Sequence, residues 1–187
     1  MNKLIEKLKT LVDITQVKAQ RDDLYFITTR SEQLTMLLAH LKEVEKFTHM
    51  AFFQAVDYIE DEKFMLTYML YNYERKVNLA VNVFIARKNP TMDSIDYLWP
   101  HAWQYQREIK EMYGIDFPNS PRVDESFVLE GWEEIPPMRR DFDTLEYSER
   151  TFYPRPGRST NAPQDYMKEQ KYPNYDNAPK IRRDNDK

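Results

Sequence analysis

Cysteine is absent from this chain of 187 residues, and glycine occurs only three times. Without cysteine, the chain can form no disulfide bond, thiolate nucleophile or cysteine-held iron–sulfur cluster. The glycines, Gly114, Gly131 and Gly157, are too widely spaced to form a dinucleotide-binding fingerprint or a phosphate-binding loop. The sequence therefore excludes the usual nucleotide-binding and redox-cluster classes for this chain itself.

Long apolar runs are also missing. No window of about 18 apolar residues occurs, so we expect no segment that spans a bilayer. Lys3, Lys7 and Lys9 are not followed by an apolar run, and we therefore expect no signal peptide. The net charge of −4 is small and favours neither nucleic acid nor an anionic lipid surface. We expect no nucleic-acid partner, and membership of a membrane-attached complex stays open.

Residues 1–90 combine helical and strand patterns. Apolar residues at helical spacing predict helices over 2–12 and 31–44, with Ser31 as the N-cap of the second helix. Short turns between the expected strands favour antiparallel pairing. The patterns predict an α+β domain over 1–90, a mostly antiparallel sheet of about five strands with helices packed on one face. The expected strands are 14–19, 24–29, 47–59, 64–72 and 77–85.

A motif helix and an interface segment are predicted over residues 91–147. Asp93 or Ser94 can cap a short helix that stops at residue 99. A longer helix then runs to about Tyr113. Gly114 follows at the point where a helix commonly ends with a left-handed residue.

The last segment, residues 148–187, has no hydrophobic period and holds five of the eleven prolines. Such a composition does not build its own core. Two interpretations stay open, a disordered end or an extended arm that becomes ordered on a partner. We favour a partner-binding arm, because tyrosine and phenylalanine are costly to leave in water. A stand-alone adaptor that binds through this Tyr- and Pro-rich tail is the alternative function.

The helix before Gly114 has a polar stripe that contains Arg107, Glu108 and Glu111. Arg107 and Glu111 have the spacing of a pair within the helix. The stripe is either a solvated face or a hydrogen-bonding strip for a partner. Catalysis by the two glutamates would need a cleft and perturbed pKa values. We regard catalysis as the weakest interpretation, and the scattered histidines lack the spacing of a metal site.

Two arginine clusters follow prolines. The first is Arg139-Arg140-Asp141-Phe142, and the second is Arg155-Pro156-Gly157-Arg158. Arginine binds carboxylates through two parallel hydrogen bonds and is favoured at interfaces. The preceding prolines stiffen the chain, which lowers the entropy lost on docking. Both clusters are therefore candidate contact sites.

Taken together, these motifs resemble the 30 kDa (C-type) subunit family of respiratory complex I and of complex-I-like membrane-bound [NiFe] hydrogenases. The family has a signature helix, which runs Glu-Arg-Glu, two residues, an acidic residue, then an aromatic residue and glycine. The corresponding residues here are Gln106-Arg107-Glu108-Ile109-Lys110-Glu111-Met112-Tyr113-Gly114. The downstream Pro-Leu-Arg-Lys-Asp-Phe stands as Pro137-Met138-Arg139-Arg140-Asp141-Phe142. Gln106 departs from the family glutamate, and the bridge between the motifs looks more like the hydrogenase branch.

The resemblance implies a non-catalytic subunit of the peripheral arm, on the cytoplasmic side of the membrane, which it would contact only indirectly through the complex. It would brace a large catalytic subunit beside an iron–sulfur small subunit. It would hold no cofactor, whereas the partners would hold iron–sulfur clusters, with a nickel–iron or quinone site as a further candidate. The expected partner interface comprises Arg107, Glu108, Glu111, Tyr113, Gly114, Arg139, Arg140, Asp141, Phe142, Arg155 and Arg158.

Overall fold

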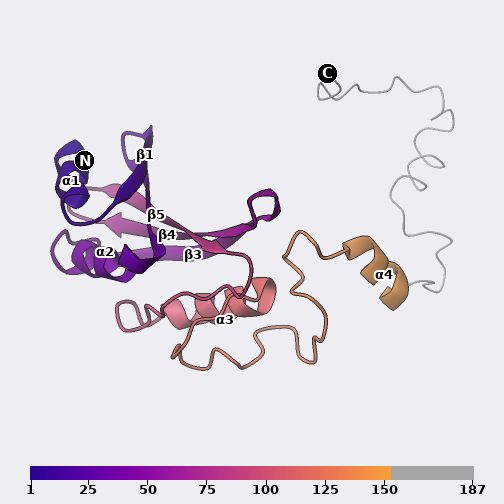
Figure 1. The fold of residues 1–187 in the computed structure, drawn as a ribbon. Coiled ribbons are helices and arrows are strands. Elements are labelled where there is room, and N and C mark those ends of the chain that lie inside the picture. The colour runs from indigo at the N-terminus through magenta and orange to yellow at the C-terminus, as the bar shows by residue number, and fades with distance from the viewer. Residues whose placement is uncertain (153–187) are drawn as a thin grey trace, which may run out of the picture. The chain divides into compact units, whose positions relative to one another are not determined.

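A five-stranded sheet in the order β1-β2-β5-β4-β3 organises the chain (Figure 1). The computed structural model describes residues 1–152. Three of the neighbouring strand pairs are antiparallel, and β2 and β5 are parallel, with Leu24 opposite Asn78 and Thr29 opposite Val83. The strands are β1 (Ile14–Arg21), β2 (Leu24–Thr29), β3 (His49–Tyr58), β4 (Lys63–Asn72) and β5 (Val77–Ala86).

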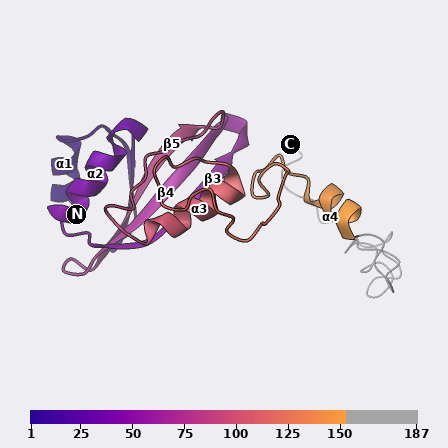
Figure 2. The ribbon, with the colours of Figure 1, turned by 90° about the horizontal axis from the view of Figure 1, so that it is seen from below.

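Three helices cover one face of the sheet. They are α1 (Asn2–Lys9), α2 (Ser31–Glu43) and α3 (Ala102–Tyr113), and a 3-10 turn, η1 (Ile59–Asp61), joins β3 to β4. Figure 2 shows α1 and α2 near one end of the strands and α3 next to β3. The α+β prediction, with helices on one face of a mostly antiparallel sheet, is confirmed.

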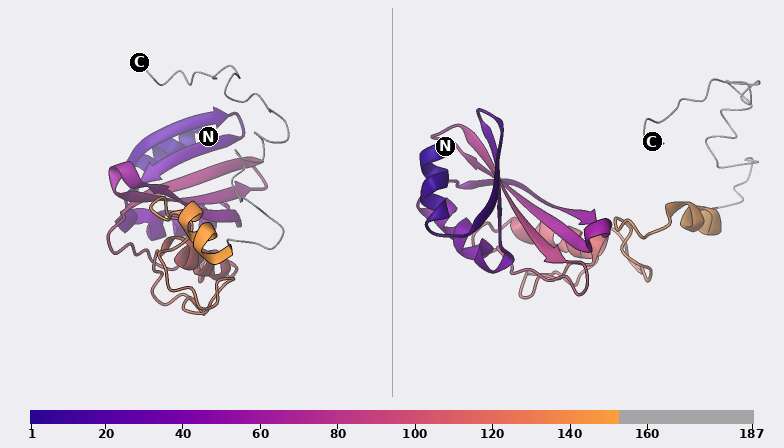
Figure 3. Two further views of the ribbon diagram at one scale, coloured as in Figure 1. Left: turned by 90° about the vertical axis from the view of Figure 1, so that its right-hand side faces the viewer. Right: turned by 45° about the horizontal axis from the view of Figure 1, so that its top comes forward.

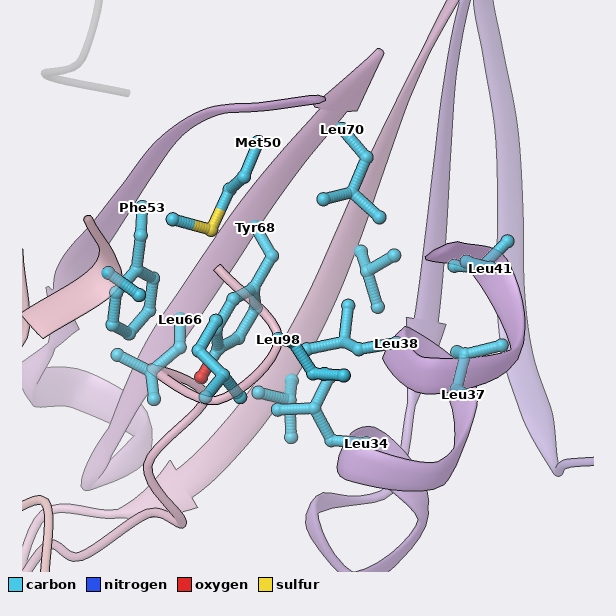
Figure 4. Close-up of a cluster of buried hydrophobic side chains, with 14 of the residues drawn as sticks. Leu34, Leu37, Leu38, Leu41, Met50, Phe53, Leu66, Tyr68, Leu70 and Leu98 are labelled. Atoms are coloured by element: carbon cyan, nitrogen blue, oxygen red, sulfur yellow. The ribbon is translucent and has the colours of Figure 1, made fainter. Parts of the chain in front are cut away.

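The core lies between the helices and the inward side chains of the strands. Alternation along β5 turns Leu79, Val81 and Val83 inward, where they are fully buried. Figure 4 shows leucines of α2 facing Leu66 and Tyr68 of β4. Burial raises the pKa of the Tyr68 phenol. Within residues 1–142 no helix covers the other face of the sheet, and Phe84 there keeps 39% of its surface exposed.

Two local predictions are wrong. Ser31 is the first residue of α2 rather than its N-cap, since Arg30 occupies the extended cap position. Its hydroxyl bonds to the Glu32 carboxylate instead of a backbone N–H. Residues 93–99 form turns rather than a short helix, because Ser94 points its hydroxyl at Asp96 and Gln106. These side-chain bonds compete with helical backbone bonds.

A further helix, α4 (Thr144–Phe152), lies in a separate unit that begins at Asp143, whereas residues 1–142 form one compact unit. Residues 148–152, which the sequence analysis places in the extended arm, are therefore helical. The rest of the arm lies outside the described residues. The divisions at residues 90 and 147 stay predictions. Within residues 1–152 no helix is long and apolar enough to cross a membrane.

Candidate partner-binding site

The motif helix α3 packs on β3 through its apolar side. Ala102 and Ile109 are buried, and the Tyr105 hydroxyl lies 3.4 Å from the Ala51 carbonyl oxygen on the outer edge of β3. Gly114 ends the helix with φ +75°, and its N–H donates to the Lys110 carbonyl oxygen at 2.8 Å. The predicted left-handed glycine is confirmed.

Gln106 is fully buried, although it is a polar residue of the motif. Its Oε1 accepts hydrogen bonds from Ser120 Oγ at 2.7 Å and from Ser94 Oγ at 3.0 Å. The amide thus joins α3 to the turns on both sides of it. A carboxylate at this position would be buried close to Asp96, which also bonds to Ser94. A neutral amide avoids placing a second negative charge there.

The polar stripe of α3 holds a segment of the chain's own backbone. Arg107 Nε donates to the Glu125 carbonyl oxygen at 2.8 Å, and Arg107 Nη2 also donates to the Ser126 carbonyl oxygen. Glu111 accepts the N–H groups of Phe127 at 2.6 Å and Val128 at 2.8 Å. The Arg107–Glu111 pair predicted from spacing is wrong, because backbone groups of residues 125–128 occupy both side chains.

The remaining members of the helix motif differ in exposure. Glu108 is exposed, whereas Tyr113 is half-buried and meets Phe64 of β4 edge-on at 6.1 Å between ring centroids. Burial raises the pKa of the Tyr113 phenol, and the nearby Asp57 and Glu108 add to the shift. The end of α3 therefore lies against the end of the sheet where Asp57 stands.

The arginine segment after the prolines folds back onto that same end of the sheet. The Arg140 N–H donates to Asp57 Oδ2 at 2.9 Å, and the Arg140 guanidinium binds the Glu60 carboxylate at 2.6 Å. Arg139 bonds to Asp141 at 3.2 Å, and its guanidinium lies 5.8 Å from the centre of the Phe64 ring.

Arg87, at the end of β5, joins the sheet to this segment. Its guanidinium donates to both oxygens of Asp57, at 2.9 and 3.0 Å, and to Asp141 at 2.7 Å. The Asp57 side chain is only 1% exposed and that of Arg87 only 15%. Two segments distant in sequence thus share one largely buried cation. We call Asp57, Arg87 and Asp141 the charge triad.

The triad shifts the pKa values of its own members. Burial opposes ionisation of Asp57, but the bonds from Arg87 and from the Arg140 N–H outweigh it, and the Asp57 pKa lies below its usual value. Burial likewise opposes ionisation of Asp141, and the bonds from Arg87 and Arg139 lower its pKa. Hydrogen bonds to the two carboxylates raise the pKa of Arg87. All three groups are ionised at neutral pH.

The helix motif and the arginine segment also touch directly. The Met138 N–H donates to the Met112 carbonyl oxygen at 3.0 Å, and a Cβ added at Gly114 would meet Pro136 Cγ at 3.1 Å. The structure therefore brings Tyr113, Gly114 and Arg139 together, while Phe142 packs on Trp132 at 5.5 Å. Arg155 and Arg158 lie outside the described residues.

Sequence reasoning missed three residues of this site, Asp57, Glu60 and Arg87. One signal was available for Asp57, since it occupies an inward position of a strand whose other inward residues are apolar. Such a buried carboxylate requires a cation or several donors. Arg87 gave no such signal, because it follows the last residue of β5 and resembles an ordinary turn residue.

Within residues 1–152, no three histidine, aspartate or glutamate side chains gather closely enough to hold a metal ion. The open face of the sheet forms a shallow hollow of about 380 Å³ lined by residues such as Phe26, Phe52 and Met65. Its lining has no carboxylate and no histidine. The charged residues of the site bind backbone groups of residues 125–128 and charged side chains of the same chain. These bonds fix the conformation of an exposed surface.

Removing the Glu111 carboxylate should release residues 127–128. In a Glu111→Ala variant, we expect amide hydrogen exchange at Phe127 and Val128 to accelerate about tenfold or more, because charge-assisted bonds to backbone N–H groups contribute roughly 1.5–3 kcal/mol. Exchange measured by mass spectrometry or NMR checks this. Glu108→Ala, an exposed change one turn away, serves as the control and should leave both amides unchanged. Equal protection in both variants would contradict the role of Glu111.

These features define a class of protein: an α+β domain whose charged residues fold its C-terminal segments into an ordered surface. Residues 27–148 match the family model described as the respiratory-chain NADH dehydrogenase 30 kDa subunit. The chain belongs to this family, and the resemblance found in the sequence is confirmed.

Three similar proteins illustrate the match. The C subunit of NADH-quinone oxidoreductase from Moorella thermoacetica is 30% identical over 142 residues, covering 76% of this chain and 95% of that protein. A C/D subunit of the same enzyme from Aquifex aeolicus is 33% identical over 110 residues, covering 58% of this chain and 18% of that protein. A chain from the membrane-bound sulfane sulfur reductase, an archaeal respiratory membrane complex, has the same fold, with a TM-score of 0.71 at 20% identity, covering 81% of this chain and 90% of that one.

Proposed function

We propose that this chain is a non-catalytic peripheral-arm subunit of a complex-I-like membrane-bound oxidoreductase, where it braces the large catalytic subunit during electron transfer. The charge triad carries the proposal. It joins Asp141 of the arginine segment to Asp57 and Arg87 at the end of the sheet, and the Met138 N–H joins the same segment to the Met112 carbonyl oxygen at the end of α3. Family membership identifies the type of complex in which that surface would act.

The names of the relatives support a large partner of the D type. The Aquifex protein is named a C/D subunit, and the segment similar to this chain covers only 18% of its length. We interpret the name as a fusion of a C-type and a D-type subunit. Fusion keeps together two subunits that otherwise associate by binding. We infer that this chain contacts a separate D-type large subunit, with an iron–sulfur small subunit beside it, on the cytoplasmic side of the membrane. The iron–sulfur clusters, and a quinone or nickel–iron site, would belong to those partners.

The residues of the expected interface divide into two roles. Glu108 and the Arg140 guanidinium are exposed and can contact a partner directly. Most of the others hold the surface in shape. Arg107 and Glu111 bind the backbone of 125–128, Gly114 lies against Pro136, and Tyr113 and Arg139 both contact the Phe64 ring. Asp141 joins the arginine segment to Arg87. Phe142 packs on Trp132. We propose that the arm beyond residue 152, with Arg155 and Arg158, adds further contacts.

Co-expression tests the proposal. The chain is produced with the D-type large subunit of its own complex, and a tag on the large subunit is used for purification. We expect stoichiometric co-elution, and a weaker complex when residues 144–187 are deleted. The truncation retains the compact unit 1–142. An untruncated chain that elutes alone would overturn the proposed function, whereas an equally tight truncated complex would overturn only the role of the arm.

The non-catalytic part of the proposal has its own test. In the purified complex, Glu108→Gln should leave the turnover number unchanged within about twofold, because an exposed carboxylate that only contacts a partner does not enter the chemistry. Loss of turnover by about a hundredfold, with the complex still assembled, would mean that Glu108 takes part in catalysis.

A further inference from the structure

The loop of residues 122–135, which links the two family motifs, is held in place by several charged contacts. Arg107 and Glu111 of α3 fix its backbone at residues 125–128. Lys110 binds Asp124 at 2.5 Å, and Arg122 binds Glu125 at 2.6 Å. The loop passes α3 on the side away from the strands (Figure 1), and two further views of the chain are given in Figure 3. It has no regular secondary structure, yet its first half, residues 122–128, is bound to α3.

Two large apolar side chains at the centre of this loop are exposed to solvent. Phe127 is 40% exposed and Val128 is 63% exposed, and both belong to residues whose N–H groups are bound by Glu111. The Arg107 guanidinium lies 5.6 Å from the centre of the Phe127 ring and orients it. Because the backbone is already fixed, these side chains would lose little entropy on docking. Exposed aromatic residues on a preorganised backbone are typical anchors of an interface.

The charge of the loop indicates what kind of surface would receive it. Residues 122–135 contain five acidic residues and one basic residue, Arg122. Asp124 and Glu125 are paired within the chain, whereas Glu130 and Glu133 are exposed and have no ion-pair partner within residues 1–152. Two unpaired negative charges thus follow the apolar pair Phe127 and Val128 in the loop. A complementary partner surface would place positive groups opposite them.

We propose that Phe127 and Val128 form a docking knob, which inserts into an apolar pocket rimmed by lysine or arginine on the large subunit. Glu130 and Glu133 would pair with that rim. This inference rests on the proposed function, which supplies the partner, and it adds a specific contact that the two family motifs do not contain. Arg107 and Glu111 act as positioning residues. Arg107 binds the carbonyl oxygens just before the knob and contacts the Phe127 ring, and Glu111 binds the N–H groups of both knob residues.

The apolar half of the proposal is tested by a double substitution, Phe127→Ala with Val128→Ser. The purified D-type large subunit is titrated with each variant by calorimetry or interferometry. We expect the dissociation constant to rise about thirtyfold or more, because truncation of a central anchor weakens binding by more than about a factor of ten. Both residues are exposed, so circular dichroism and the unfolding midpoint should match those of the original chain.

A matched control replaces an exposed apolar pair on and just after α2, Met36→Ala with Val44→Ser, each 54% exposed. This control should bind with an unchanged constant. The charge half is tested by Glu130→Lys with Glu133→Lys, which should weaken binding at least about tenfold at low salt and reverse the sign of the salt dependence. The corresponding glutamine pair should reduce the salt dependence without reversing it.

The outcomes separate the two levels of inference. If the original chain binds the large subunit and the Phe127/Val128 variant binds equally well, the knob is wrong and the proposed function stands. If the α2 control loses as much affinity as the knob variant, the knob is likewise wrong. If the original chain shows no binding at all, the proposed function itself fails.

Discussion

Replacing Arg87 with methionine should lower the free energy of unfolding by about 3–5 kcal/mol, the range found when one partner of a buried ion pair is removed. Asp57 would lose both of its arginine side-chain bonds while remaining 1% exposed, and Asp141 would lose its shortest one. Methionine preserves most of the side-chain volume, so the loss reports on charge rather than on a cavity. Urea unfolding followed by circular dichroism measures it.

Arg21→Met provides the matched control. Arg21 and Asp23 form a pair at 3.2 Å whose side chains are 64% and 52% exposed, and removing it should change stability by less than about 1 kcal/mol. If the two variants lose equal stability, the triad has no special role.

The pH dependence of the Arg87 variant follows from the lowered pKa values of Asp57 and Asp141. A carboxyl whose folded pKa is lowered adds stability that is fully present above its unfolded pKa, near about 3.9, and is lost as the pH falls through the folded value. The original chain and the Arg87→Met variant should therefore differ most at neutral pH. Their stabilities should converge as the pH falls below about 4.

Phe64→Ala should be about as damaging, with an expected loss of about 3–5 kcal/mol. Phe64 is fully buried at the start of β4, where the guanidiniums of Arg87 and Arg139 each lie 5.8 Å from its ring and Tyr113 contacts it edge-on. The substitution removes the ring on which the triad and both motifs converge. We expect the unfolding midpoint in urea to fall sharply, and α3 and the arginine segment to lose protection from hydrogen exchange together.

Two further variants locate the cause. Phe84→Ala removes the same side chain from β5 on the open face, where it is 39% exposed, and should cost less than about 1.5 kcal/mol. Phe64→Leu keeps most of the apolar volume and should lose about 1–2 kcal/mol, partly from cation–π contacts. Equal losses at Phe64 and Phe84 would mean that the contacts around Phe64 contribute nothing beyond ordinary burial.

Much of the sheet could be predicted because large apolar side chains recur at every second position of the strands. In β5 they stand at Val77, Leu79, Val81, Val83 and Ile85, and the strand is found where it was expected. The parallel pairing of β2 with β5 could not be predicted in the same way. Turn lengths report on neighbours in sequence, whereas Leu24 and Asn78 are far apart along the chain. Their pairing depends on how the whole sheet buries its inward face.

The sequence identified several residues of the site but not the residues that they contact. Arg107, Glu111 and Asp141 were predicted to belong to the interface, yet their hydrogen-bond partners lie in other elements. Helical spacing placed Arg107 within reach of Glu111, and it could not show that backbone groups of residues 125–128 compete for both. Gln106 was noted only as a departure from the family glutamate, and nothing in the sequence indicated that it is fully buried and accepts hydrogen bonds from two serines.

The order of strands has a consequence for how the polypeptide is made. The hairpin of β1 and β2 leaves the ribosome first, but its parallel neighbour β5 ends only at Ala86. Until β5 has been synthesised, β2 lacks the strand with which it pairs. Contacts between residues so far apart in sequence form slowly. We therefore expect the β3–β4–β5 meander to form first and to serve as the template on which the earlier-synthesised hairpin settles.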